Sequence, residues 1–330
     1  MKKIFSFLML FVFGLMLVSC GDEAESAKLT YVDPSTGEEK VATISPTSDK
    51  EAVLNALNLV TANVKEVTTD VKAELEMDMS MEITASGQGT TLSVVTNMNI
   101  DYDMYMSETD GIYAEGEMEN VSTYMGMKST TTSTMKMYTD DVYAYTHTKT
   151  KTSMFGQAEE EETKEYTTLD DAFGENDMTN MFDFDNVVNG KTNDAIVEEY
   201  NVSISNTTAK TIEFKIVMDL ADLENMEGLE DTGMDISELP AETKVTYYIT
   251  YNVETCLPVS AKFDFNDFMN AYANISAAEM KDQGAETASG KGKFIMTLNM
   301  SYGDYDIKKL PDDQKSEYVL GDSDSFIEIM

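Results

Sequence analysis

A strict alternation of apolar and polar residues over positions 71–83 constrains the fold more than any other feature of this sequence. The odd positions from Val71 to Ile83 are all apolar, and every even position between them is charged or is serine. A period of two is typical of a β-strand, because successive side chains point to opposite faces of a sheet. One dry face and one wet face are expected, as in an antiparallel sheet that packs on one side only.

The same alternation recurs further along the chain and predicts about ten strands. It is visible over 92–106, 112–118, 142–146, 212–220, 245–253, 257–265 and 294–302, and a strand with a Ser/Thr-rich centre between methionines is expected over 125–137. Turn sequences such as Ser86–Gly89 and Asp110-Gly111 separate neighbouring runs and indicate hairpins. The stretch from Gln157 to Asn193 and the acidic insertion from Glu224 to Glu242 lack a clear pattern and are expected to be less regular.

Helical periodicity is confined to a few segments. Val53, Leu57, Val60 and Val64 recur at three- and four-residue steps and predict a helix over 49–67. Further helices are expected near 169–182 and 267–281. The predicted fold class is α+β, with a strongly curved antiparallel sheet (a half-barrel of about ten strands) and two or three helices that cover its dry face. Several strands exceed the usual length, which favours curl and bulges.

The N-terminal segment has the pattern of an export signal. Lys2 and Lys3 precede an almost wholly apolar run from Ile4 to Val18, and Ser19-Cys20 closes it. As a membrane-spanning helix the run would reach only about 22 Å, short of a ~30 Å hydrocarbon core. A cysteine at this exit resembles the lipobox of bacterial lipoproteins, in which the thiol is diacylated and the preceding peptide is removed.

That resemblance implies lipidation of Cys20 and a protein anchored to the cell membrane on its extracytoplasmic side. The expected organisation is a signal peptide over 1–19, a lipidated N-terminus and flexible tether over 20–48, one domain over 49–310 and a C-terminal tail over 311–330. Two acyl chains are enough for stable attachment, whereas one is marginal.

Charge and composition argue against a nucleic-acid partner and against catalysis by histidine or cysteine. The net charge is −38, and every basic residue is lysine. A nucleic-acid partner is excluded because neutralising phosphates requires a basic surface. The single histidine, His147, and the second cysteine, Cys256, lack catalytic neighbours in the sequence and are interpreted as a solvated strand residue and a turn residue.

No motif indicates an enzyme, a metal or a cofactor. The chain has no Walker A motif, no nucleophile elbow and no zinc spacing. The run Glu159–Glu162 and the insertion Glu224–Glu242 could collect divalent cations, but neither has the spacing of an EF-hand, and solvated acidic loops are the favoured interpretation. The protein is therefore expected to be non-enzymatic, with no catalytic or metal site.

Two stretches resemble the LolA/LolB and LppX/LprG group of bacterial lipoproteins. Residues 247–259, Tyr-Tyr-Ile-Thr-Tyr-Asn-Val-Glu-Thr-Cys-Leu-Pro-Val, are similar to the strand, "T-G-L-P-V" turn and strand of that group, with Cys256 in place of glycine. Residues 302–306, Tyr-Gly-Asp-Tyr-Asp, with Leu310-Pro311-Asp312, are similar to its closing strand. The resemblance implies a half-barrel sheet closed by helices around an apolar cavity that receives acyl chains of lipoproteins or glycolipids.

Methionine on the dry face is the candidate ligand-binding feature. Methionine is unbranched and polarizable, so it adapts to irregular apolar partners. The expected groove consists of Met77, Met79, Met81, Met98, Ile100, Met104, Phe214, Ile216, Met218, Phe263, Met296 and Leu298. Its ligand would be a lipid acyl chain or another long apolar molecule. The alternative is an ordinary packed core, with an acidic outer face that binds a cationic partner; no protein partner can be named.

Overall fold

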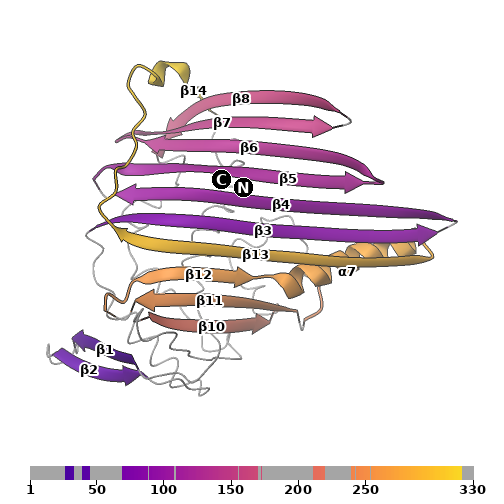
Figure 1. Cartoon of the computed structure of the whole chain (residues 1–330), viewed down its shortest axis with the longest axis horizontal. Helices are drawn as coiled ribbons and strands as arrows, with labels where there is room; N and C mark the ends of the chain where they lie inside the picture. Colours follow the sequence, from indigo (N-terminus) through magenta and orange to yellow (C-terminus); the bar gives the residue numbers. More distant parts are fainter. Residues whose placement is uncertain are drawn as a thin grey trace.

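The computed structural model is dominated by one broad, mostly antiparallel sheet (Figure 1). It describes residues 27–32, 39–44, 69–87, 89–107, 109–154, 156–169, 172, 211–219, 239–241, 243–252 and 254–321. The strands are β1 Ala27–Val32, β2 Glu39–Ile44, β3 Asp70–Gly87, β4 Thr90–Ser107, β5 Gly111–Tyr124, β6 Met127–Thr139, β7 Tyr143–Met154, β8 Gln157–Thr168, β10 Thr211–Asp219, β11 Lys244–Asn252, β12 Pro258–Asp264, β13 Thr287–Gly303 and β14 Val319–Leu320. The helices are α7, Asn266–Asp282, and the 3₁₀ turn η3, Lys315–Glu317.

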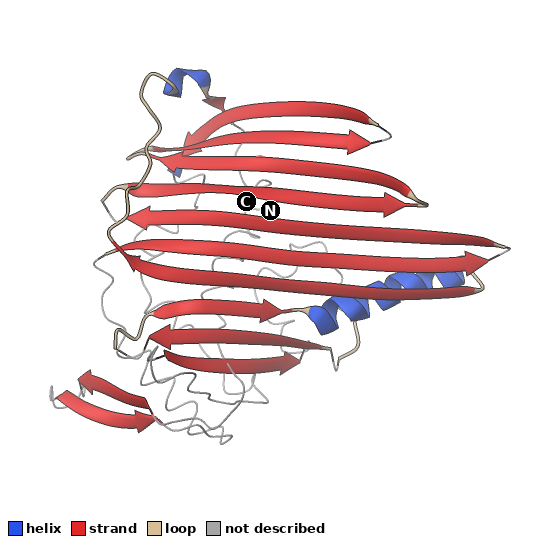
Figure 2. Cartoon of the chain, in the orientation of Figure 1, coloured by secondary structure: helices blue, strands red, loops and turns tan. Residues whose placement is uncertain are grey.

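Eleven strands form the large sheet in the order β10-β11-β12-β13-β3-β4-β5-β6-β7-β8-β14. Every pairing is antiparallel except that of β14 with β8, so the sheet is mixed, and its two end strands do not pair to close it. β13 lies beside β3, which joins the late hairpins to the early meander. The strands β3, β4 and β13 are the longest, and at one end of the sheet they extend past their neighbours (Figure 2).

The predicted α+β class is wrong in the number of helices. Within the described part of the chain, α7 is the single α-helix, where two or three were expected, and the architecture is mostly β. The helix expected over 267–281 is α7. The helix expected over 49–67 and nearly all of the one expected near 169–182 lie outside the described residues.

Three segments differ from their expected roles. Residues 27–44 fell in the expected tether, yet β1 and β2 pair there as a separate two-stranded sheet. The run Glu159–Glu162, favoured as a loop, lies within β8. The expected tail begins at residue 311, but η3 and β14 bring residues 315–320 against β8. Residues 322–330 lie outside the described part.

The strand register defines two faces of the sheet. The methionine face carries the odd residues of β3, with Met77 between Ile100 of β4 and Met296 of β13. The carboxylate face carries the even residues of β3, with Glu76 beside Asp101 of β4 and Thr297 of β13. The predicted dry and wet faces of the 71–83 strand are therefore the two faces of this sheet.

Helix α7 packs on the methionine face over β13. Its buried side chains are Phe268, Met269, Ala273 and Ala277. Beyond the end of β12, the Asn270 side chain accepts a hydrogen bond from the Gly292 N–H (3.0 Å), and that of Asn266 accepts one from the Phe294 N–H (3.1 Å). The helix thus satisfies the β13 backbone where β12 no longer pairs with it.

Candidate functional site: the methionine face

Backbone register brings the predicted groove residues onto one face. Met77 pairs with Met296 and Ile100, and Met79 pairs with Met98. Met296 also pairs with Phe263 of β12, and in the next row Leu298 pairs with Leu75. Met81, Ile100 and Met104 follow from the same alternation in β3 and β4. For Phe214, Ile216 and Met218 of β10, the pairing with Ile249, Tyr247 and Val245 of β11 places the backbone in the same rows.

Burial divides these residues into a closed part and a more open part. Phe263 and Met296 are 1% exposed and Leu298 is 7% exposed, so they belong to the packed core beside α7. Met77, Met79, Met81, Met98, Ile100 and Met104 on the two central strands are only partly buried. The face therefore has a packed part on β12 and β13 and a part on β3 and β4 whose side chains are only partly buried.

The helix reaches the closed part because β13 has glycine beneath it. A Cβ added to Gly292 would lie 2.5 Å from the Met269 carbonyl oxygen, and one added to Gly290 would overlap the Ala273 backbone. Phe265, at the start of α7, stacks on Phe294 with ring centroids 5.0 Å apart and on Phe263 at 6.4 Å. The two glycines and the aromatic contacts together hold α7 close to β13, and the helix also contacts β3 and β11.

Tyr102 lies within the open part of the face, between Ile100 and Met104 on β4. It pairs with Leu75 of β3 and Gly116 of β5, and its ring occupies the space that a Cβ on Gly116 would fill. Burial raises the pKa of the Tyr102 hydroxyl. Tyr102 and Gly116 were not among the predicted residues; the isolated glycine in the alternating strand 111–124 was the available signal.

Beyond the methionines, the same face becomes rich in hydroxyl groups. Ser133 and Thr150 are 2.9 Å apart, Thr131 and Thr152 are 3.3 Å apart, and these pairs bridge β6 and β7. Among the described side chains, the Thr148 hydroxyl is a buried oxygen without a hydrogen-bond partner, and it lies beside Met135 in the register. The face therefore offers apolar contact on β3 and β4 and hydrogen-bonding groups on β6 and β7.

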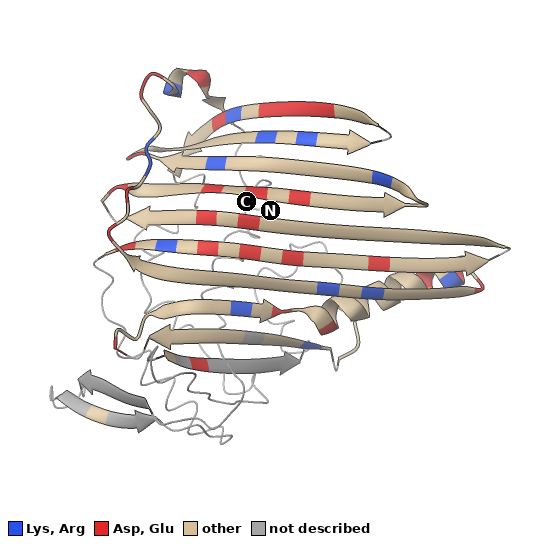
Figure 3. Ribbon diagram, viewed as in Figure 1, with Lys and Arg blue, Asp and Glu red and all other residues tan. Residues whose placement is uncertain are grey.

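Acidic residues recur along β3, β4 and β5 (Figure 3), and the strand register places them in rows on the opposite face. Glu74, Asp103 and Glu115 form one row across β3, β4 and β5, and Glu76, Asp101 and Glu117 form the next. Lys72 pairs with two acids of the first row, with its Nζ 2.5 Å from Glu74 and 3.1 Å from Asp103, and Lys308 pairs with the third, Glu115. Its hydrogen bond to Glu74, opposed by partial desolvation and aided by Asp103, raises the pKa of Lys72.

The second carboxylate row has no lysine partner within the part of the chain that the structure describes. Glu76, Asp101 and Glu117 form no ion pair there, although like charges that lie directly opposite repel one another. Across the described residues, no three His, Cys, Asp or Glu side chains converge as ligands for a metal ion. This row can attract mobile cations or a cationic surface, but it does not coordinate one ion.

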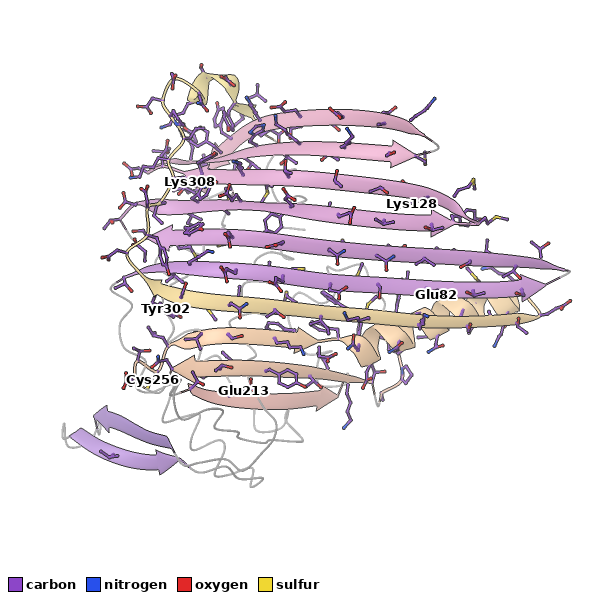
Figure 4. All side chains as sticks on the ribbon, viewed as in Figure 1. Glu82, Lys128, Glu213, Cys256, Tyr302 and Lys308 are labelled. Atoms are coloured by element: carbon purple, nitrogen blue, oxygen red, sulfur yellow. The ribbon has the colours of Figure 1, made fainter. Side chains whose placement is uncertain are left out.

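The remaining sequence candidates lie apart from the methionine face. His147 is on the carboxylate face of β7, where its Nε2 lies 2.7 Å from Glu162, and Glu162 also pairs with Lys149 at 3.2 Å. Cys256 is buried in the β11–β12 turn with a positive φ of 56°, as expected for a turn residue (Figure 4). Cys20, the expected lipidation site, lies outside the described residues.

Comparisons with known proteins give no family. No protein-family model matches the chain, and no curated protein matches it significantly. Across the described residues, no helix combines the length and apolar character needed to span a membrane.

Proposed function

We propose that this protein binds a lipid acyl chain, or another long apolar molecule, on the open part of its methionine face. One observation carries the proposal. The central methionines Met77, Met79 and Met98 remain partly buried side chains on the face where α7 packs over the neighbouring strand β13. Flexible thioether side chains in such a position suit a ligand of variable shape.

The size of the ligand follows from the energy of burial. A sixteen-carbon chain gains roughly 12 kcal/mol when all its CH₂ groups leave water. A protein that accepts and releases such a chain needs only to approach this value. The polar end of the ligand would meet the Ser133 and Thr150 hydroxyls at the margin of the apolar area.

The wider proposal is an extracytoplasmic lipoprotein held at the cell membrane by acylated Cys20, with no enzymatic activity. The resemblance to the LolA/LppX group supports it, together with an open antiparallel sheet that carries a helix on its apolar face. In this proposal the sheet curves into a half-barrel around the ligand. Radiolabelled palmitate should be incorporated by the native chain and not by Cys20→Ala.

Ligand binding is tested with the purified protein. Organic extraction followed by mass spectrometry should recover lipid, and a fluorescent fatty acid should bind with saturation. Met79→Asp and Met98→Asp should abolish probe binding while the protein stays folded. Thr134→Asp, at an exposed position on the opposite face, is the matched control and should bind normally. Global unfolding by the methionine variants, with no lipid recovered from the native chain, would instead favour a packed core.

A second candidate is an interaction protein whose carboxylate face binds a cationic partner. The unpaired row of Glu76, Asp101 and Glu117 favours it, because these charges have no lysine among the described residues. Oligolysine should then bind with an affinity that falls as salt is added. Replacing the row by Gln, Asn and Gln should remove this binding and leave fatty-acid binding intact.

A further inference from the structure

Exposed apolar side chains gather on two neighbouring hairpin tips. Tyr124, Met125 and Met127 form the β5–β6 tip, and Met154 ends β7 at the β7–β8 tip. Their exposed fractions are 51%, 51%, 45% and 49%. Figure 1 shows both tips at the same end of the sheet, opposite the end that the C-terminal segment crosses. Single exposed apolar residues are normal, whereas a cluster is a sign of an interaction.

The tip residues are adjacent and continue the methionine face. Tyr124 pairs directly with Met127, and Met154 pairs with Ser129, two residues further along β6. Tyr124 also pairs with Val94, which pairs with Ile83. An apolar row thus runs from buried Ile83 across three strands to the exposed tip.

Met125 occupies a backbone conformation that disfavours its side chain. Met125 and Gly126 have φ values of 50° and 80°, the left-handed pair of a type I′ hairpin turn. Asn, Asp or Gly is strongly preferred at the first of these positions because a longer side chain is strained there. The methionine is therefore unfavourable for the turn, and it is 51% exposed.

We propose that the β5–β6 and β7–β8 tips dock on the surface of a zwitterionic lipid bilayer, which has no net charge. The area argues against a second protein: these side chains offer on the order of 400 Å², about half of the ~800 Å² that each partner contributes to a standard interface. A bilayer has no such minimum. Tyrosine suits the boundary between lipid and water, and the exposed Lys128 beside Met127 can extend its ammonium group towards headgroups (Figure 4).

Charge selects the type of bilayer. Glu159–Glu162 begins shortly after Met154 on β8, and the chain as a whole has a net charge of −38. These charges would be repelled by anionic lipids, so the occupant is a zwitterionic surface such as phosphatidylcholine. This proposal does not depend on the ligand site, because docking and ligand binding are measured separately.

The test places a fluorophore at the tip. In the full-length chain with Cys20→Ser, Met125→Cys is labelled with an environment-sensitive dye; native Cys256 is 1% exposed and is protected. With phosphatidylcholine vesicles, the emission should shift to the blue and doxyl-lipids should quench it several-fold more than a label at Asp141→Cys. Asp141 is exposed at the opposite end of the sheet and is the control. Because the readout is local, it is independent of how the N-terminus attaches.

A second variant separates docking from folding. Tyr124→Thr, Met127→Thr and Met154→Thr combined should reduce doxyl quenching at position 125 to the level seen at position 141, with an unchanged melting temperature. Vesicles of phosphatidylglycerol should give weaker quenching than phosphatidylcholine. The proposal is overturned if the triple variant is quenched as strongly as the parent, if iodide reaches position 125 equally with and without vesicles, or if the blue shift needs no vesicles and grows with protein concentration. The last result would show self-association.

Discussion

Lys308 Nζ lies 2.5 Å from the Glu115 carboxylate and 4.4 Å from the centre of the Tyr113 ring, which joins the C-terminal segment to the middle of the sheet. We call residues 304–318 the C-terminal strap. It runs from the end of β13 across the strand ends towards β8 (Figure 1). Lys309 pairs with Asp110 at 2.5 Å and Lys315 with Asp140 at 2.9 Å, so successive lysines of the strap meet acids of successive hairpins.

Removal of the Glu115 charge is expected to destabilise the protein at neutral pH but not near pH 2. The hydrogen bond from Lys308, with help from Tyr113, lowers the pKa of Glu115 from 4.5 to about 2. A carboxyl group with a lowered folded-state pKa stabilises the fold above its unfolded pKa, and this contribution is lost as the pH falls towards 2. Because the pair is partly exposed, Glu115→Gln should cost about 1 kcal/mol at pH 7 and almost nothing near pH 2.

Urea unfolding of the native chain and Glu115→Gln across this pH range measures the difference. Glu119→Gln is the control, since Glu119 lies on the same strand and forms no ion pair within the described residues. A constant difference between the native chain and Glu115→Gln at all pH values would contradict the assigned pair.

Gly292→Ala is expected to loosen α7 from the sheet. The new methyl group would lie 2.5 Å from the Met269 carbonyl oxygen, so the helix must move and its hydrogen bond from the Gly292 N–H to Asn270 weakens. Overpacking of this kind costs about 2 kcal/mol. Gly303→Ala on the same strand meets no atom within 4 Å and should be neutral. Equal unfolding midpoints in urea for the two variants would show that α7 does not depend on this close approach.

Local alternation predicted the central strands and their two faces, because the period of two is a property of each strand alone. Alternation over 71–83 was enough to place Met77 and Met79 on the less polar face. β8 could not be predicted in this way, because four consecutive glutamates have no period. They form a strand through their neighbours: Lys151 pairs with Glu160, and Lys149 with Glu162, across the β7–β8 ladder.

The strap was missed for a related reason. Its contacts join residues far apart in the sequence, as Lys308 and Glu115 do, and no local pattern reveals them. Leu310 and Tyr318 pack with Tyr145 in a small core on the carboxylate face, and burial raises the pKa of Tyr318 to about 12. Isolated apolar residues in an otherwise polar tail were the available signal.

Substitution of Glu159 and Glu161 by Val is expected to cause self-association through β8. Within the described residues, β14 pairs only with Glu165 and Tyr166, so the outer backbone groups of 157–164 face no strand. Acidic side chains on such an edge prevent another chain from adding to it. Light scattering should detect larger species in the double variant. Glu119→Val is the control. It also removes a charge, but β5 is paired on both sides and offers no free edge, so this variant should keep its native size.

Tyr102→Ala is expected to widen the open part of the methionine face. The Tyr102 ring covers Gly116 of β5. Its removal uncovers the β5 backbone at this point and leaves a space between the Ile100 and Met104 side chains of β4. A fatty acid with a bulky or branched chain should then bind more tightly relative to a straight one, because the lost ring leaves apolar space for the extra carbon. Fluorescence competition between straight-chain and branched-chain acids measures this ratio.

The variant should also lose about 3 kcal/mol of stability, typical of an aromatic residue truncated in a packed environment. Tyr248→Ala is the matched control, because Tyr248 lies on the carboxylate face of β11, paired with Lys215 and Lys262. An unchanged ratio in Tyr102→Ala would place the ligand away from this row of residues.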